Sequence, residues 1–136
     1  MQSQRGSKKF ETLTNEEMAW VEAERSKYAP TCSTEDIAFA YSRLATIFRC
    51  PITRIRAEQK FGSDLRASFN SFFRRNEIDQ IRLDLEDVQV DLSPELKVDY
   101  DAAITVLGYV TVMCEAATLA RKYLRRELTK SLNRLR

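Results

Sequence analysis

Residues that commonly carry out chemistry are scarce in this sequence and form no catalytic group. The 136-residue chain has no histidine, so the commonest general base and metal ligand is missing. Its three cysteines, Cys32, Cys50 and Cys114, are widely spaced and form no CxxC pair. Their odd number and spacing predict reduced thiols in a cytoplasmic protein, and argue against a zinc site or a disulfide framework. We therefore expect neither enzymatic activity nor a bound metal.

Charged side chains form two opposite fields along the chain. Residues 77–101 hold nine acids against two bases, a net charge of −7, and residues 121–136 hold seven bases against one acid, a net charge of +6. Such fields predict protein partners with charged surfaces. The expected partner-binding residues are Asp79, Asp84, Glu86 and Asp87 in the acidic region, and Arg121, Lys122, Arg125 and Arg126 in the basic region. Two solvated helix faces are the alternative interpretation, which stays open.

Composition predicts one all-α domain. Glycine and proline occur only three times each, which favours long helices over the many turns of a β fold. Residues 1–9 are polar, basic and without periodicity, so we expect a disordered arm followed by a single helical domain over residues 10–136. Residues 1–9 lack the apolar core of a secretion signal, and no apolar run in the sequence is long enough to span a bilayer.

Two helices are expected in the first half of the chain. Thr14, with Glu17 three residues later, predicts a capping box at the start of the first helix. Ser33 or Thr34 caps the second helix, in which apolar residues recur at steps of three and four up to the break at Pro51.

The pattern between Ile78 and Leu92 allows two interpretations. Apolar residues there recur at steps of three and four, as in a helix, and some of them also alternate, as in two strands of a hairpin. Because an isolated hairpin is only marginally stable in water, we predict a helix through about Leu85 and an extended piece from Val88 to Leu92. A turn or loop then begins at Ser93-Pro94.

A long helix is expected to close the chain. Asp99 or Asp101 caps it, and apolar residues follow at helical spacing from Ala103 to Leu132. This helix is longer than a small bundle can cover. We therefore divide it into a part that belongs to the bundle and a basic amphipathic extension over residues 111–136.

Over residues 34–110 the order of these features resembles that of the acyl carrier protein family. The matching pieces are Ile37 to Phe48, Phe61-Gly62-Ser63-Asp64-Leu65, Asn70-Ser71-Phe72, Val88-Gln89-Val90-Asp91 and Asp101-Ala102-Ala103-Ile104. They are similar, in order, to the first helix, the run into the carrier-serine turn, the turn itself, the extension with its acid, and the closing helix. The resemblance implies a small bundle, here with an added N-terminal helix and an elongated C-terminal helix.

The resemblance also implies a phosphopantetheine arm on Ser71. Ser68 is a competing candidate, and a plain helix cap is the structural alternative for Ser71. Asparagine stands before this serine and phenylalanine after it, where the family has aspartate and leucine.

Three kinds of partner are open for the basic C-terminal helix. An anionic membrane surface needs only peripheral contact. Nucleic acid is disfavoured, because the bases lack a series of interleaved aromatic residues and no reading helix is evident. A helical protein partner, including this protein's own acidic face, fits best. We predict a non-catalytic carrier-like or protein-docking module with an acidic recognition helix. The alternative is a helical regulatory or structural protein, homodimeric through residues 104–132, that carries no prosthetic group.

Overall fold

A computed structural model describes residues 13–65 and 77–134 of the chain, and it confirms the all-α prediction for them. Four α-helices are present in this part: α1 (Asn15–Arg25), α2 (Thr34–Phe48), α3 (Glu77–Leu92) and α4 (Val106–Arg134). Two short 3-10 helices, η4 (Ile52–Arg54) and η6 (Ala102–Ile104), lie in the connections. Strand-like pairing in these residues is limited to two isolated bridges, between Lys60 and Thr105 and between Phe61 and Leu65.

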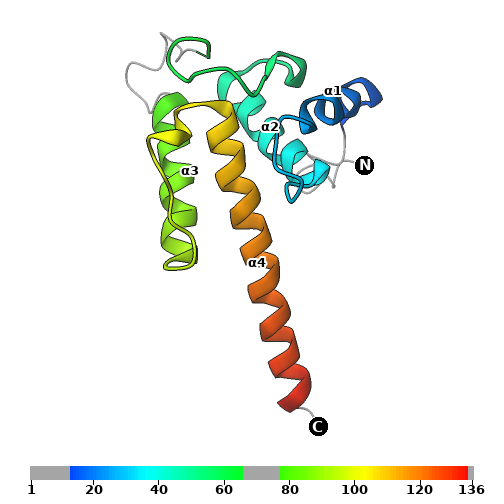
Figure 1. Ribbon diagram of the computed structural model, residues 1–136, viewed down its shortest axis with the longest axis vertical. Coiled ribbons are helices and arrows are strands. Elements are labelled where there is room, and N and C mark those ends of the chain that lie inside the picture. The colour runs from blue at the N-terminus through cyan, green and yellow to red at the C-terminus, as the bar shows by residue number, and fades with distance from the viewer. Residues whose placement is uncertain (1–12, 66–76, 135–136) are drawn as a thin grey trace, which may run out of the picture.

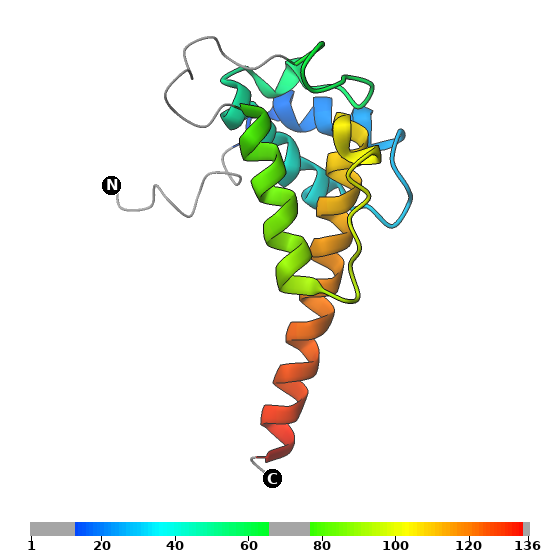
Figure 2. The same ribbon diagram turned by 90° about the vertical axis from the view of Figure 1, so that its left-hand side faces the viewer.

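The helices pack around the first half of α4. In Figure 1, α2 and α3 flank this half, α1 lies on the outer side of α2, and the rest of α4 extends beyond them. Figure 2 shows that α3 runs beside only the first part of α4. The buried core between the helices is mainly aliphatic and aromatic, and its largest fully buried side chains are Tyr41, Tyr109, Ile37, Leu44, Ile55, Val21, Val106 and Val110.

Local signals in the sequence fix the starts of α1 and α2. Thr14 Oγ1 accepts a hydrogen bond from the Glu17 amide at 3.0 Å, and Glu17 Oε1 accepts one from the Thr14 amide at 2.9 Å, which confirms the capping box. Ser33 Oγ accepts from the Asp36 amide at 3.1 Å, so Ser33 rather than Thr34 caps α2. The left-handed conformation of Arg49, with φ of 57°, ends α2 just before Pro51.

The predicted extended piece from Val88 to Leu92 is wrong, because α3 continues as a helix to Leu92. The helical steps of the pattern decide the conformation, since Ile81 and Leu85 are buried on one face of α3 while Val90, on the opposite face, is 77% exposed. The Gln89 side chain also favours the helix. Its amide donates to the Leu96 carbonyl at 2.6 Å and accepts from the Val98 amide at 2.7 Å, and so holds the returning connection against α3.

The start of the last helix also differs from the prediction. Asp99 Oδ1 accepts hydrogen bonds from the amides of residues 101 and 102 at the entrance to η6, whose N-cap is Asp101, so neither aspartate caps the long helix. Thr105 is extended and its hydroxyl accepts from the Gly108 amide at 3.0 Å, which places the start of α4 at Val106.

The prediction of reduced thiols is wrong for two of the three cysteines. Cys32 and Cys114 form a disulfide between the α1–α2 connection and α4, whereas Cys50 is a free thiol. A separation of 82 residues hides this pair in the sequence, and only packing of α4 on α2 brings the two together. Disulfides are typical of oxidising compartments, so the cysteines no longer favour a cytoplasmic location.

Candidate protein-docking surfaces

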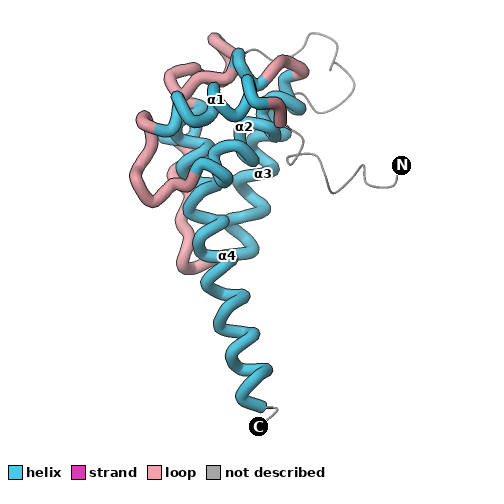
Figure 3. Tube along the Cα trace, turned by 90° about the vertical axis from the view of Figure 1, so that its right-hand side faces the viewer, coloured by secondary structure: helices cyan, strands magenta, loops and turns pink. Residues whose placement is uncertain are grey.

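The C-terminal half of α4 forms a projecting arm, which we define as residues 121–134. Figures 1 and 3 show it leaving the other helices and continuing alone. At 1.5 Å per residue the arm is about 20 Å long. From residue 122 to residue 134 every residue is exposed except Glu127, which is half-buried. A single helix of this length is only marginally stable in water, so contact with a partner would stabilise the arm.

A stripe of leucines runs along the arm. Leu124, Leu128 and Leu132 follow each other at steps of four and are 59%, 56% and 61% exposed. Residues four apart lie on the same helix face. Within the bundle the same face carries Val110 and Cys114, which are buried. The leucine stripe is therefore the uncovered continuation of the surface that α4 buries against α2.

The four predicted basic partner-binding residues all lie at the start of the arm, but one of them has an internal partner. Arg121 donates two hydrogen bonds to Asp36, at 3.1 and 3.0 Å, and these bonds raise the pKa of its guanidinium. Lys122, Arg125 and Arg126 are exposed and form no ion pair within the described residues. The arm as a whole has six bases and one acid, a net charge of +5.

The predicted acidic docking residues divide into two kinds. Asp84 is held inside the protein, because Arg43 Nε and Nη2 donate to its two carboxylate oxygens at 2.9 Å each and the Tyr109 hydroxyl donates at 2.7 Å. Its side chain is only 17% exposed. Asp84 therefore joins α2, α3 and α4, and its carboxylate is already satisfied by internal donors, which makes it a poor docking residue.

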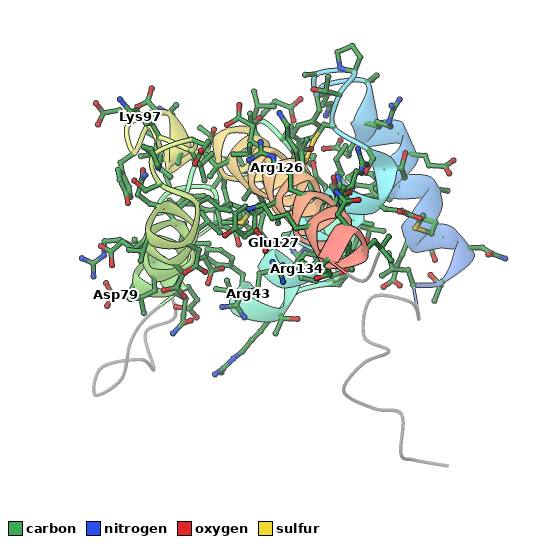
Figure 4. The ribbon with its side chains drawn as sticks, turned by 90° about the horizontal axis from the view of Figure 1, so that it is seen from below. Arg43, Asp79, Lys97, Arg126, Glu127 and Arg134 are labelled. Carbon is green, nitrogen blue, oxygen red and sulfur yellow. A yellow bond between two sulfur atoms is a disulfide. The ribbon has the colours of Figure 1, made fainter. Side chains whose placement is uncertain are left out.

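The other three acids lie on the outer side of α3. Asp79 accepts from Arg82 one turn along the helix at 3.1 Å. Figure 4 looks along α4 from below and shows Asp79 on the side of α3 that faces away from α4. Glu86 and Asp87 are exposed and have no ion pair in residues 13–65 or 77–134. Leu83, which is half-buried, and Val90, which is exposed, lie on this same side of α3, because residues seven apart share a helix face. In the sequence they flank Glu86 and Asp87.

A second buried polar cluster, which sequence reasoning missed, holds α1 against α2. Glu24 is 4% exposed and its carboxylate accepts from the Tyr41 hydroxyl at 2.7 Å, the Ala57 amide at 2.9 Å and Lys27 Nζ at 2.7 Å. Because Tyr41 gives its one proton to Glu24, Tyr28 donates to Tyr41 across 2.8 Å. These partners satisfy the buried charge, so the cluster is structural. A glutamate at a buried helical position was its only sequence signal.

An open pocket of about 550 Å³ lies beside the disulfide. The α1–α2 connection, the segment after α3 and the middle of α4 line it, and its lining includes Cys32 and Cys114 with the apolar Leu96 and Leu119. Its charged residues, Glu95, Lys97 and Glu115, are all exposed. No buried charge points to a particular ligand.

Ser71, the predicted phosphopantetheine site, and Ser68 lie outside the described residues. In the part of the chain that is described, no group of three or more histidine, cysteine or acidic side chains could hold a metal ion. Nor does any described helix have the length and apolar character needed to cross a bilayer. Comparison with protein-family models, curated proteins and solved structures finds no match to this chain.

Proposed function

We propose that this protein is a non-catalytic docking module that binds an acidic helical face of a protein partner through the arm of α4. One observation carries the proposal: the leucine stripe continues the buried face of α4 but is itself exposed, and it is accompanied by bases that form no ion pair with any described residue. Apolar residues along one helix face with flanking charges are the pattern of a helix that packs on another helix.

The width of the stripe favours a helix over a membrane. Leu124, Leu128 and Leu132 form a narrow seam, whereas helices that lie in a membrane interface present a broad apolar face. The flanking Arg125 and Lys130 would then steer the partner and select an acidic one, since charges at the edge of an interface act mainly on association rate and specificity.

Photocrosslinking in the native cell tests this function. A photoreactive amino acid replaces Thr129 beside the stripe, and a matched control carries it at Glu22, an exposed position on α1. We expect one discrete protein adduct from position 129 that disappears in the Leu124→Ser/Leu132→Ser background, and none from position 22. Adducts with lipid or nucleic acid alone, or the same adducts from both positions, contradict the proposal.

A more specific function, that of a carrier with a phosphopantetheine arm on Ser71, remains a proposal supported by the residue pattern around this serine. The helical conformation of α3 through Leu92 weakens it, because the piece similar to the family's extension is not extended. Intact mass after coexpression with a phosphopantetheinyl transferase tests it. A mass gain that is lost in Ser71→Ala supports the carrier function, and an unchanged mass removes it. A cytoplasmic location likewise remains a proposal.

A further inference from the structure

We propose that the partner of the arm is a second copy of this chain, and that the two copies exchange arms so that each arm lies on the outer side of α3 of the other copy. This inference rests on the proposed docking function and names its partner. The outer side of α3 is defined here by Asp79, Leu83, Glu86, Asp87 and Val90.

The charges of the two surfaces are complementary. Helix α3 has six acids and one base, a net charge of −5, and the arm has a net charge of +5. Opposite potentials across an interface favour that pairing and disfavour like-charged ones. Two arms packed directly on each other would bring ten units of positive charge together, so the charges argue against a dimer formed by the arms alone.

The apolar residues of the two surfaces also correspond. On the arm, Leu124 and Leu132 are eight residues apart, about 12 Å. On α3, the distance from Leu83 to Val90 is seven residues, about 10 Å. Val90 is 77% exposed, although valine is usually buried. Each surface therefore offers an apolar line of similar length beside charges of the opposite sign.

The arm cannot reach the acidic face of its own chain. Figures 1 and 2 show that α3 ends beside the middle of α4, and only the first turns of the arm lie near that end, where Lys122, Tyr123 and Arg126 line a small pocket with Leu92 and Glu95. The arm is the direct continuation of α4, and Arg121 fixes its start to Asp36 of α2. An acidic helical face can therefore cover the leucine stripe only if another molecule supplies it. A two-fold axis would then make both contacts at once, as in most homodimers.

Complementary charge reversal tests the exchange. One variant is Arg125→Glu/Arg126→Glu on the arm, and the other is Glu86→Lys/Asp87→Lys on α3; none of these four residues has an ion pair within the described residues. Sedimentation velocity over a range of concentrations and salt gives the dimer Kd. Circular dichroism confirms that each variant is folded.

We expect the wild-type protein to dimerise and each variant alone to dimerise at least about tenfold more weakly. An equimolar mixture of the two variants should restore the dimer, because each reversed arm then meets a reversed α3 and each wild-type arm meets a wild-type α3. The control Glu16→Lys/Glu22→Lys makes the same charge change on α1 and should dimerise like the wild type. Dimerisation should weaken as salt rises.

Three results overturn the inference. If the wild-type protein stays monomeric at high concentration, the second copy is not the partner, while the photocrosslinking at position 129 still decides whether the arm docks on another protein. If the α3 variant dimerises normally and the arm variant pairs more tightly with wild type than wild type does with itself, the arms pack on each other. If the monomer binds vesicles containing phosphatidylserine and the arm variant does not, the arm serves a membrane surface.

Discussion

Arg121 of α4 and Asp36 of α2 form a bidentate ion pair, with N–O distances of 3.1 and 3.0 Å, across 85 residues of sequence. The Asp36 side chain is 12% exposed and the Arg121 side chain is 57% exposed. Just beyond this pair, Lys122, Tyr123 and Arg126 line a small pocket with Leu92 and Glu95, and from there α4 continues as the arm. The pair thus fixes the direction in which the arm leaves the bundle.

Removing this ion pair should lower stability only modestly. In a double-mutant cycle of Arg121→Ala and Asp36→Ala, we expect a coupling of about 0.5–1 kcal/mol in the free energy of unfolding, because one partner is largely exposed. Urea unfolding of the four proteins measures it, and added salt should reduce it. A coupling near zero would show that the pair does not hold the base of the arm.

Asp84→Asn should destabilise the protein much more than Glu86→Gln, although the two acids lie two residues apart on α3. Asp84 accepts three hydrogen bonds from Arg43 and Tyr109, and its replacement leaves these donors without a carboxylate. We expect a loss of about 1–3 kcal/mol in the free energy of unfolding for Asp84→Asn. For the exposed Glu86 the change should stay within about 0.5 kcal/mol. Equal losses would contradict the structural role of Asp84.

Signals that lie close together in the sequence predicted the fold well. The capping box at Thr14 and Glu17 and the apolar steps through α2 depend on neighbours a few residues away, and both are confirmed. The prediction failed at residues 88–92, where short-range alternation competed with the helical pattern. Gln89 helps decide that competition by holding the connection at Leu96 and Val98, a contact that requires the chain to have already turned back.

The candidate surfaces could be predicted only in part, for the same reason. Charge runs pointed to both α3 and the arm, and the exposed Glu86 and Arg125 agree with that prediction. Sequence could not distinguish Asp84 from Glu86, because the difference depends on Arg43, which is 41 residues away. The Cys32–Cys114 disulfide was missed on the same grounds, since its cysteines meet only when α4 packs on α2.

Gly108→Ala should destabilise the protein even though alanine is the better helix former. A Cβ at position 108 would lie 1.9 Å from the Ala102 carbonyl oxygen, so η6 or α4 would have to shift. We expect a loss of about 1–3 kcal/mol in thermal or urea unfolding, in spite of a gain of about 1 kcal/mol in helix propensity. Ala120→Gly at an exposed position of the same helix is the control, and should show the ordinary propensity loss alone. A stabilised Gly108→Ala protein would contradict the close approach of η6.

Breaking the Cys32–Cys114 disulfide should destabilise the protein by roughly 2–4 kcal/mol, because the bond closes a long loop in the unfolded chain. Urea unfolding with and without dithiothreitol measures the loss. The variant Cys50→Ser keeps the disulfide and should respond to the reductant like the wild type, whereas Cys32→Ala/Cys114→Ala should not respond at all. Three titratable thiols in the denatured, unreduced protein would show that the bond does not form.

Alkaline pH should unfold the protein through its buried tyrosines. Burial raises the pKa of Tyr28, Tyr41 and Tyr109 above the ordinary value of about 10. A folded-state pKa that is raised gives stability that is complete below the unfolded-state pKa and is lost as pH rises towards the folded-state value. Above pH 10 the unfolded chain ionises these phenols and the folded protein does not. The free energy of unfolding should then fall by up to about 4 kcal/mol per pH unit for the three together.

Absorbance at 295 nm and urea unfolding between pH 8 and 11 measure this effect. The phenols of Tyr28, Tyr41 and Tyr109 should ionise only as the protein unfolds, since each is at least nine-tenths buried and hydrogen-bonded to another tyrosine or to a carboxylate. Tyr28→Phe removes the outermost member of the Glu24 cluster without leaving Glu24 unpaired, and it should flatten the pH dependence by about one third. Full ionisation of all three phenols in the folded protein near pH 10 would show that the clusters around Glu24 and Asp84 are open to solvent. In that case neither cluster could hold α1, α2 and α4 in the arrangement that leaves the arm uncovered.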